Sequence, residues 1–177
     1  RSDRQWAAMM MGDESYAGSA SFFQLKETIT RITGFEYIIP THQGRAAENV
    51  LFSHLVKAGA IVPGNSHFDT TKGHIESRKA FAIDCTVDEA KNTQLEVPFK
   101  GNVDPKKLEA VLAENADKVP FIIVTITNNT AGGQPVSMEN LRAVREIADK
   151  YGKRVVFDSA RFVENAYFIR TREAGYA

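Results

Sequence analysis

The sequence predicts an α/β fold with a mostly parallel sheet flanked by helices. Apolar stretches of strand length alternate along the 177 residues with longer stretches of helical period. The stretch VPFIIVTIT, residues 119–127, is nearly all apolar, as expected of a strand that is buried on both faces. The alternation therefore predicts parallel strands joined by helices that cover both sides of the sheet.

The first part of the chain is expected to contribute two helices and a strand. Residues 20–33 carry apolar side chains near helical spacing, and Gly34 ends the pattern. Residues 35–41, FEYIIPT, are typical of a strand. Residues 44–59 predict a second helix that Gly59 closes. The apolar face of that helix would hold Ala47, Val50, Leu51, His54 and Leu55.

Two short strands are expected next, at residues 60–64 and 79–85. Between them lies the polar stretch HFDTTKGHIESR, residues 67–78. Binding residues are often carried by loops between rigid elements. We therefore expect residues 67–78 to form a functional loop.

The second half predicts helices and strands in alternation. A helix at residues 104–116 opens with Asp104 as its cap and Pro105 at its first position, and it leads into the apolar strand already described. A helix at 137–152 begins at a serine and ends at a glycine. The strand KRVVFD, residues 153–158, follows it.

The composition narrows the class of protein. Lysine plus arginine and aspartate plus glutamate number 22 each, so we expect neither a nucleic acid nor a membrane surface as partner. The one cysteine, Cys85, excludes an intrachain disulfide and fits a reducing compartment, so we expect a cytoplasmic protein. The chain begins at Arg1 and ends at Ala177 within a helical pattern. We expect residues 1–177 to be one domain, truncated at both ends, of a longer protein.

The carboxyl ends of three predicted strands carry polar residues, and ligands of open α/β sheets bind at such ends. Gln43, Gly44 and Arg45 follow the first of these strands and open a helix, whose amino end suits a phosphate group. An ordinary turn with a solvated arginine is the alternative. Asn129, after residues 119–127, could hold a hydroxyl or oxyanion, or it could satisfy the backbone of the turn.

Asp158 ends the last predicted strand. A carboxylate in such a crevice costs several kcal/mol unless it is paired. A protonated ring nitrogen would pair with it, and Arg161 could neutralise it instead. A phosphate site, a hydroxyl site and a ring-nitrogen partner together match the polar groups of pyridoxal 5′-phosphate (PLP), whose ring acts as an electron sink in enzymes.

Longer motifs run in order across nearly the whole chain. They are MMMGDESYAGS (9–19), PTHQGRAAEN (40–49), HFDTTKGH (67–74), FKGNVD (99–104), TNNTAGGQPVS (127–137) and DSARFVENAYFI (158–169). In these motifs the chain resembles the β-eliminating lyases, the family of tryptophanase and tyrosine phenol-lyase. The resemblance implies part of the large domain of a PLP-dependent, aminotransferase-like (fold type I) enzyme. It also implies β-elimination from an aromatic amino acid to pyruvate and ammonia, activation by potassium, and a homotetramer.

The resemblance also implies roles for single residues. Gln43, Gly44 and Arg45 would hold the phosphate, Phe68 would stack on the cofactor ring, Asn129 and Arg161 would hold the 3′-oxygen, and Asp158 would pair with the pyridine nitrogen. Tyr16 would act as general acid for the leaving group across a subunit interface. Glu14 would help to bind the potassium ion.

One residue that the family's reaction requires is missing from the chain. The family's Schiff-base lysine, in a Ser-Gly-Lys-Lys-like segment, is not among the 177 residues, and the family pattern gives Lys72 no such role. We therefore expect the chain alone to lack lyase activity. Another fold-type-I enzyme, such as an aminotransferase, remains an alternative, as does a non-catalytic protein that binds anions or self-associates.

Asp69 bears on the substrate. Tryptophanases resemble this chain in carrying aspartate after the stacking aromatic residue, whereas tyrosine phenol-lyases carry threonine. A carboxylate can accept the hydrogen bond of the indole N–H group, so Asp69 predicts a preference for L-tryptophan. Asp69 could instead be a solvated loop residue or cap the following turn through Thr71. Tyrosine phenol-lyase remains the alternative. Its sequences are more similar to this chain in MMMGDESYAGS (9–19) and QPVSMENLRAVRE (134–146).

Overall fold

The structure, a computed structural model, describes residues 2–13 and 18–176. The chain forms two compact units, Arg1–His42 and Gln43–Ala177, which are described separately. No helix in the described ranges is long and apolar enough to cross a membrane.

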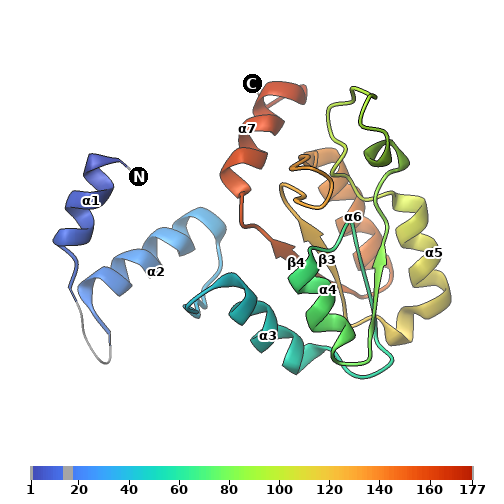
Figure 1. The fold of residues 1–177 in the computed structure, drawn as a ribbon, viewed down its shortest axis with the longest axis horizontal. Helices are drawn as coiled ribbons and strands as arrows, with labels where there is room; N and C mark the ends of the chain where they lie inside the picture. The colour runs from blue at the N-terminus through green and yellow to red at the C-terminus, as the bar shows by residue number, and fades with distance from the viewer. Residues whose placement is uncertain (1, 14–17, 177) are drawn as a thin grey trace. The chain divides into compact units, whose positions relative to one another are not determined.

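The first unit contains helices α1 (Asp3–Met10) and α2 (Ala20–Thr33), as Figure 1 shows. The bounds predicted for α2 are confirmed, and Gly34 ends this helix with a φ of 76° that favours glycine. Helix α1 was not predicted from the sequence. Its signal is the capping box in which Ser2 and Gln5 exchange side-chain and backbone hydrogen bonds.

The strand predicted at residues 35–41 is wrong. The structure assigns no strand there, and Phe35, Tyr37 and Ile39 are all exposed. A strand is stabilised by hydrogen bonds to a neighbouring strand. No described segment pairs with these residues, so strand-like composition alone does not make them a strand.

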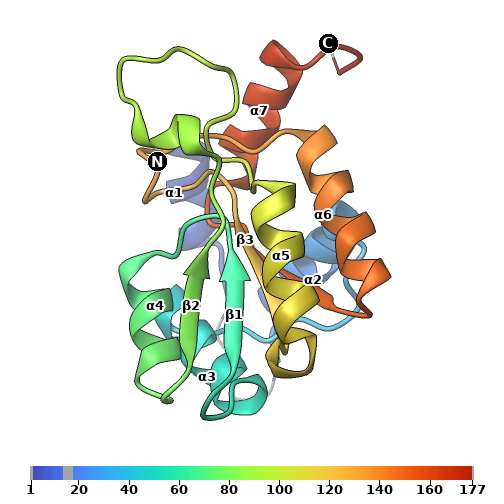
Figure 2. The same cartoon turned by 90° about the vertical axis from the view of Figure 1, so that its right-hand side faces the viewer.

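The second unit is built on a four-stranded parallel sheet (Figure 2). Its strands are β1 (Ile61–Gly64), β2 (Phe81–Asp84), β3 (Phe121–Thr125) and β4 (Arg154–Asp158), in the order β2-β1-β3-β4. All three pairings are parallel. The prediction of a mostly parallel sheet is confirmed, and every residue of β3 is buried.

Helices cover both faces of this sheet. The second unit's α-helices are α3 (Gly44–Leu55), α4 (Asp69–Glu76), α5 (Pro105–Asn115), α6 (Met138–Lys150) and α7 (Phe162–Arg172), and short 3-10 helices lie at η1 (Asp88–Lys91) and η2 (Ala116–Lys118). Residues of α5 and α6 pack with Ile122 and Val124, while residues of α3 and α4 pack with Phe121 and Ile123. Because side chains alternate along a strand, the two cores lie on opposite faces of β3.

Two predictions in the first half of this unit need correction. Residues 67–78 are not a loop, because α4 occupies most of them and buries Thr71 and Ile75, which are four residues apart. Helix α3 ends at Leu55, before Gly59. Its buried residue is Phe52, whose ring stacks on Phe121 at 5.5 Å, and Val50 is exposed.

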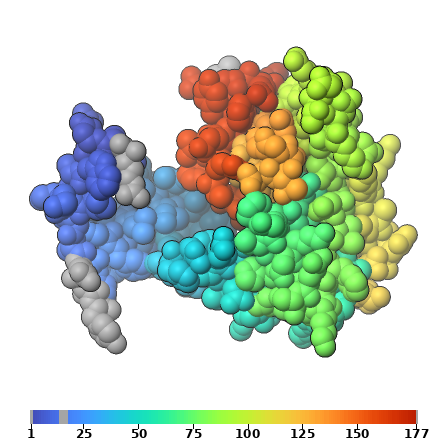
Figure 3. Space-filling view, in the orientation of Figure 1, coloured from blue at the N-terminus to red at the C-terminus, as the bar shows by residue number. Residues whose placement is uncertain are grey.

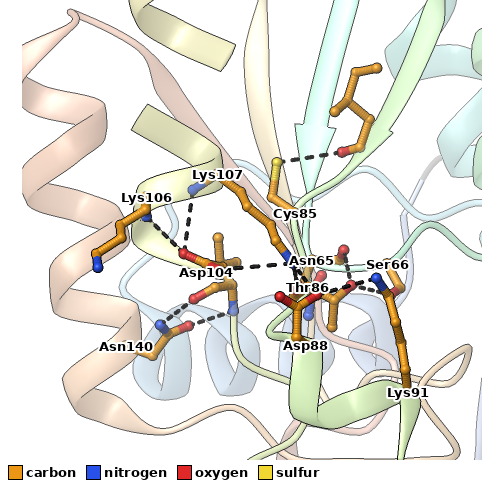
Figure 4. Close-up of polar contacts among 12 residues, drawn as sticks. Asn65, Ser66, Cys85, Thr86, Asp88, Lys91, Asp104, Lys106, Lys107 and Asn140 are labelled. Carbon is orange, nitrogen blue, oxygen red and sulfur yellow. Dashed lines mark hydrogen bonds and ion pairs between the residues drawn. The ribbon is translucent and has the colours of Figure 1, made fainter. Parts of the chain in front are cut away.

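Buried asparagines take the place of missing backbone partners. The Asn65 amide donates to the Gly101 and Thr125 carbonyl oxygens (2.8 and 2.9 Å) and accepts from the Thr125 N–H group (3.0 Å). Asn140 exchanges the same kind of bonds with both backbone groups of Val103. Asn65, Asn140 and the polar residues around them beside α5, drawn in Figure 4, are called the polar layer here. Each side chain fastens a connecting segment to the fold.

The same layer joins the segment after β2 to α5 (Figure 4). Lys107 donates to the Thr86 carbonyl oxygen (2.8 Å) and to the Asp88 carboxylate (2.7 Å). Cys85 lies beside these residues, and burial raises the pKa of its thiol to about 12. The thiol is therefore protonated and unreactive at neutral pH.

Candidate active site

The ends of three strands bring the candidate residues of the second unit together. Thr125 pairs with Asp158 and Gly64 pairs with Ile123, so β1, β3 and β4 end side by side. The segments that follow these strands are Asn65–Phe68, residues 126–130 and residues 159–161. Parallel pairing thus brings these three segments to one edge of the sheet, although the strand predicted before Gln43, at residues 35–41, is not among those that form this edge.

Arg161 contacts Asn129, as expected if the two residues serve one ligand oxygen. The Arg161 guanidinium donates to Asn129 Oδ1 (2.9 Å) and to the Thr127 carbonyl oxygen (3.2 Å). Asn129 is exposed on the loop that Figure 3 shows in orange, next to the red α7 segment. The carbonyl and the amide fix the guanidinium, which can present its other N–H groups to an anionic oxygen.

Asp158 is half-buried at the end of β4 and is not ion-paired with Arg161 in the described part of the chain. Burial raises the pKa of its carboxyl group, and the charge of Glu48 adds to the rise. The Ala160 N–H group (3.4 Å), Arg161 and Thr125 only partly oppose it. A cationic hydrogen-bond donor would therefore stabilise the ionised Asp158 carboxylate.

Phe68 and Asp69 begin α4. Phe68 is the half-buried N-cap residue, and Asp69 is exposed in the first turn. The Asp69 carboxylate accepts a hydrogen bond from the Thr70 N–H group (2.7 Å), where the helix dipole favours negative charge. The second carboxylate oxygen of Asp69 is not used in this bond, so Asp69 can also bind a donor on a ligand.

Gln43, Gly44 and Arg45 form the amino end of α3. Gln43 is the N-cap and makes no side-chain capping bond to the helix, and all three residues are exposed. A Cβ atom added at Gly44 would meet no other atom within 4 Å. Packing therefore does not require glycine at this position, and an anion can approach the backbone of the helix end closely.

Three residues considered in the sequence analysis, Glu14, Tyr16 and Lys72, are not part of this group. Glu14 and Tyr16 lie outside the described residues. Within residues 2–13 and 18–176, no three histidine, cysteine, aspartate or glutamate side chains are grouped to hold a metal ion. Lys72 is largely exposed on α4, with its Nζ atom 3.8 Å from the Glu76 carboxylate.

Two acidic residues near these segments, Glu48 and Asp84, were not predicted from the sequence. Glu48 of α3 accepts hydrogen bonds from the hydroxyl groups of Thr70 (2.8 Å) and Thr71, and so joins α3 to α4. Asp84, at the end of β2, binds His67. The available signal was weak, namely a glutamate one turn into a helix and an aspartate at a strand end.

The chain matches a family model along nearly its whole length. The model is described as "Beta-eliminating lyase" and matches residues 2–176. A "Probable beta-eliminating lyase" of Trichomonas vaginalis is 80% identical, a "Tyrosine phenol-lyase" of Pasteurella multocida 52% and a "Tryptophanase" of Rhodobacter capsulatus 53%. Each match covers 99% of this chain but only 38–39% of the relative. The chain thus spans about two fifths of the length of these relatives.

Solved structures share the fold at low sequence identity. Cystalysin from Treponema denticola, whose structure contains a PLP cofactor, matches with a TM-score of 0.63 at 14% identity, over 85% of this chain and 38% of its own. An N-succinyldiaminopimelate aminotransferase from Mycobacterium tuberculosis matches with a TM-score of 0.62 at 18% identity, over 79% of this chain and 35% of its own. These matches confirm the predicted aminotransferase-like fold. The sheet and the family model lead to one conclusion, that the chain belongs to the β-eliminating lyase family.

Proposed function

We propose that the full-length protein is a PLP-dependent lyase that cleaves an aromatic amino acid by β-elimination and releases pyruvate and ammonia. The observation that carries the proposal is Asp158, a half-buried carboxylate whose pKa is raised by burial while Arg161 binds Asn129 instead. A protonated pyridine nitrogen would supply the cationic partner that this carboxylate lacks among the described residues. The family supports the reaction class.

The chemistry of the residues at this edge of the sheet suits the polar groups of PLP. Bound PLP supplies an electron sink for a carbanion at the substrate Cα atom. Asp158 would keep the proton on the pyridine nitrogen, and Asn129 and Arg161 would hold the 3′-oxygen. Phe68 would cover one face of the ring.

The amino end of α3 would hold the phosphate group, with Gln43, Gly44 and Arg45 around it. From the resemblance, Tyr16 would donate a proton to the leaving group and Glu14 would help to bind potassium. We also propose, on the same ground, that residues 1–177 are part of the large domain of a cytoplasmic homotetramer.

Asp69 would set the substrate preference, and we expect L-tryptophan to be preferred over L-tyrosine. The Asp69 carboxylate is exposed and held at Oδ1 by Thr70, so it can accept the indole N–H bond and stabilise positive charge on the protonated ring. A tyrosine phenol-lyase is the alternative function, because relatives with that name are as similar as those named tryptophanase.

Asp69→Thr in the full-length enzyme is expected to lower kcat/KM for tryptophan by about 10- to 100-fold, the loss of a hydrogen bond to a charged group. The measurement is pyruvate release from tryptophan and from tyrosine. Asp117→Thr, at another exposed aspartate, is the matched control and should change neither rate. If wild-type enzyme prefers tyrosine, the substrate assignment is wrong, and if neither amino acid yields pyruvate, the lyase assignment is wrong.

The 177-residue chain by itself is expected to release no pyruvate and to form no covalent adduct with PLP. The reason is that the family's Schiff-base lysine is not in this sequence. The test is borohydride reduction after addition of PLP, followed by peptide mapping. A reduced adduct on Lys72 would contradict the expectation.

A further inference from the structure

The segment that leads from β1 to Phe68 is held by side chains from other elements. The Ser66 carbonyl oxygen accepts a hydrogen bond from Asn128 Nδ2 (3.1 Å). The His67 carbonyl oxygen accepts one from the Thr130 hydroxyl group (3.0 Å). The two donors lie on either side of Asn129, so the segment before Phe68 and the loop of Asn129 are fixed to one another.

Asp84 holds the same segment from the other side. One carboxylate oxygen, Oδ1, accepts from both the His67 N–H group (2.9 Å) and the His67 Nδ1 atom (2.7 Å). Burial alone would raise the pKa of Asp84, but the hydrogen bonds from His67 outweigh it and lower the pKa. The carboxylate is therefore ionised at neutral pH, and it fixes the backbone and the ring of His67 together.

The imidazole of His67 is used at one nitrogen only. Its side chain is fully buried, and Nε2 has no hydrogen-bond partner among the described residues. Nδ1 contacts Asp84, whereas Nε2 is a buried polar atom without a partner among the described residues, which is unfavourable. An apolar side chain could fill the space without that cost. The advantage of histidine here therefore lies in the Nδ1–H bond.

Gly64 makes room for this ring at the end of β1. A Cβ atom on Gly64 would lie 3.3 Å from Cε1 of His67 and 2.6 Å from the Ile123 carbonyl oxygen. The glycine lets the imidazole lie against β1 while Nδ1 contacts the end of β2. The site of the pair is thus built into two neighbouring strands.

We propose that Asp84 and His67 form a positioning pair that sets Phe68 against the loop of Asn129. The pair acts through the backbone, since His67 directly precedes Phe68 and its carbonyl oxygen is bound by Thr130. The inference rests on the proposed function, in which Phe68 and Asn129 contact PLP. It makes cofactor affinity depend on two residues that do not themselves contact the cofactor.

The first test uses full-length apoprotein titrated with PLP, with the dissociation constant and the circular dichroism of the bound cofactor as readouts. Asp84→Ala removes both hydrogen bonds and is expected to raise the dissociation constant about tenfold or more. It should also change the cofactor's dichroic band, because the ring would stack differently. Asp84→Asn keeps an oxygen that accepts both bonds and should stay close to wild type.

The matched control is Asp88→Ala. Asp88 is a neighbouring carboxylate that binds Lys107 and Lys91 but not the segment before Phe68. Its dissociation constant for PLP should equal that of wild type. Wild-type affinity in Asp84→Ala would overturn the inference, whereas failure of wild-type apoprotein to bind PLP would instead overturn the proposed function.

A second pair of variants separates the two ring nitrogens and decides the question even if Asp84→Ala does not fold. His67→Asn places an amide N–H near the Nδ1 position and has no counterpart of Nε2, whereas His67→Leu has neither. We expect His67→Asn to bind PLP more tightly than His67→Leu. The two dissociation constants are compared at temperatures equally far below each variant's unfolding midpoint. Equal weakening in both, or in neither, would overturn the role assigned to Nδ1.

Discussion

Asp158→Asn in the full-length protein is expected to lower kcat by about 10²- to 10³-fold while the fold persists. An asparagine amide would not keep a pyridine nitrogen protonated, so bound PLP would be a weaker electron sink. The size of the effect is that of removing one preorganised electrostatic contact, about 3–4 kcal/mol. The measurement is pyruvate release under saturating substrate and PLP, and near-normal kcat would refute the role of Asp158.

The same variant is expected to raise the thermal unfolding midpoint of the apoprotein at neutral pH. Because burial raises the pKa of Asp158 in the folded state, the folded chain holds the carboxyl proton more tightly than the unfolded chain. The contribution of Asp158 to stability therefore falls as pH rises above the ordinary value of 3.8. Below that value both states are protonated and the contribution is constant.

The measurement is thermal unfolding of wild-type and Asp158→Asn apoprotein at pH 4 and pH 7. The gain in the variant should be larger at pH 7. Asp117→Asn, at an exposed aspartate, should show no gain at either pH. A midpoint that falls in Asp158→Asn would show that the carboxylate is a structural partner rather than a group kept for the cofactor.

Asn65→Leu is expected to cause a large loss of folding stability. Leucine has a similar volume but leaves the Gly101 carbonyl oxygen and the Thr125 N–H group without the bonds that Asn65 gives them. Each buried group left unpaired costs about 1–3 kcal/mol, against a typical total stability of about 5–15 kcal/mol. We expect a marked fall in the urea midpoint, or no stable fold.

The measurement is urea unfolding of the full-length protein followed by far-ultraviolet circular dichroism. Asn115→Leu is the matched control, because among residues 2–13 and 18–176 the Asn115 amide bonds a single group, the Val111 carbonyl oxygen one turn back in α5, at 3.3 Å. Asn65→Asp keeps the acceptor for Thr125 but turns a buried carboxylate oxygen toward the Gly101 and Thr125 carbonyl oxygens, so its midpoint should be no higher than that of Asn65→Leu. Equal midpoints for Asn65→Leu and Asn115→Leu would contradict the prediction.

Elements with local end signals were predictable from the sequence. Gly34 ends α2, Asp104 caps α5 and Ser137 caps α6, and each of these signals acts within a few residues of the chain. The strand predicted at 35–41 failed because pairing depends on a distant partner. Helix α4 was missed because its buried residues, Thr71 and Ile75, are too few to show a helical period.

Some residues of the candidate site were also predictable from the sequence, whereas the contacts between distant residues were not. The carboxyl ends of the predicted strands pointed to Asp158 and Asn129, because parallel topology follows from the alternation of elements. The contact of Asp84 with His67 could not be read from the sequence, since the two residues are 17 positions apart and meet only through the pairing of β1 with β2. The contacts of Glu48 with α4 likewise depend on how two helices pack.

The pairing of Thr125 with Asp158 limits how this sequence can change in length. The Ile126 N–H group bonds the Asp158 carbonyl oxygen at 2.9 Å, so the backbone of Asp158 is part of the β3–β4 ladder. Deleting one residue between Arg154 and Phe157 would turn the side chains beyond the deletion to the opposite face of the sheet. Residues 93–96 are exposed and lie outside the sheet, so insertions or deletions there leave the β3–β4 register unchanged. Gains and losses of single codons are therefore expected at residues 93–96, whereas β4 is expected to vary by substitution.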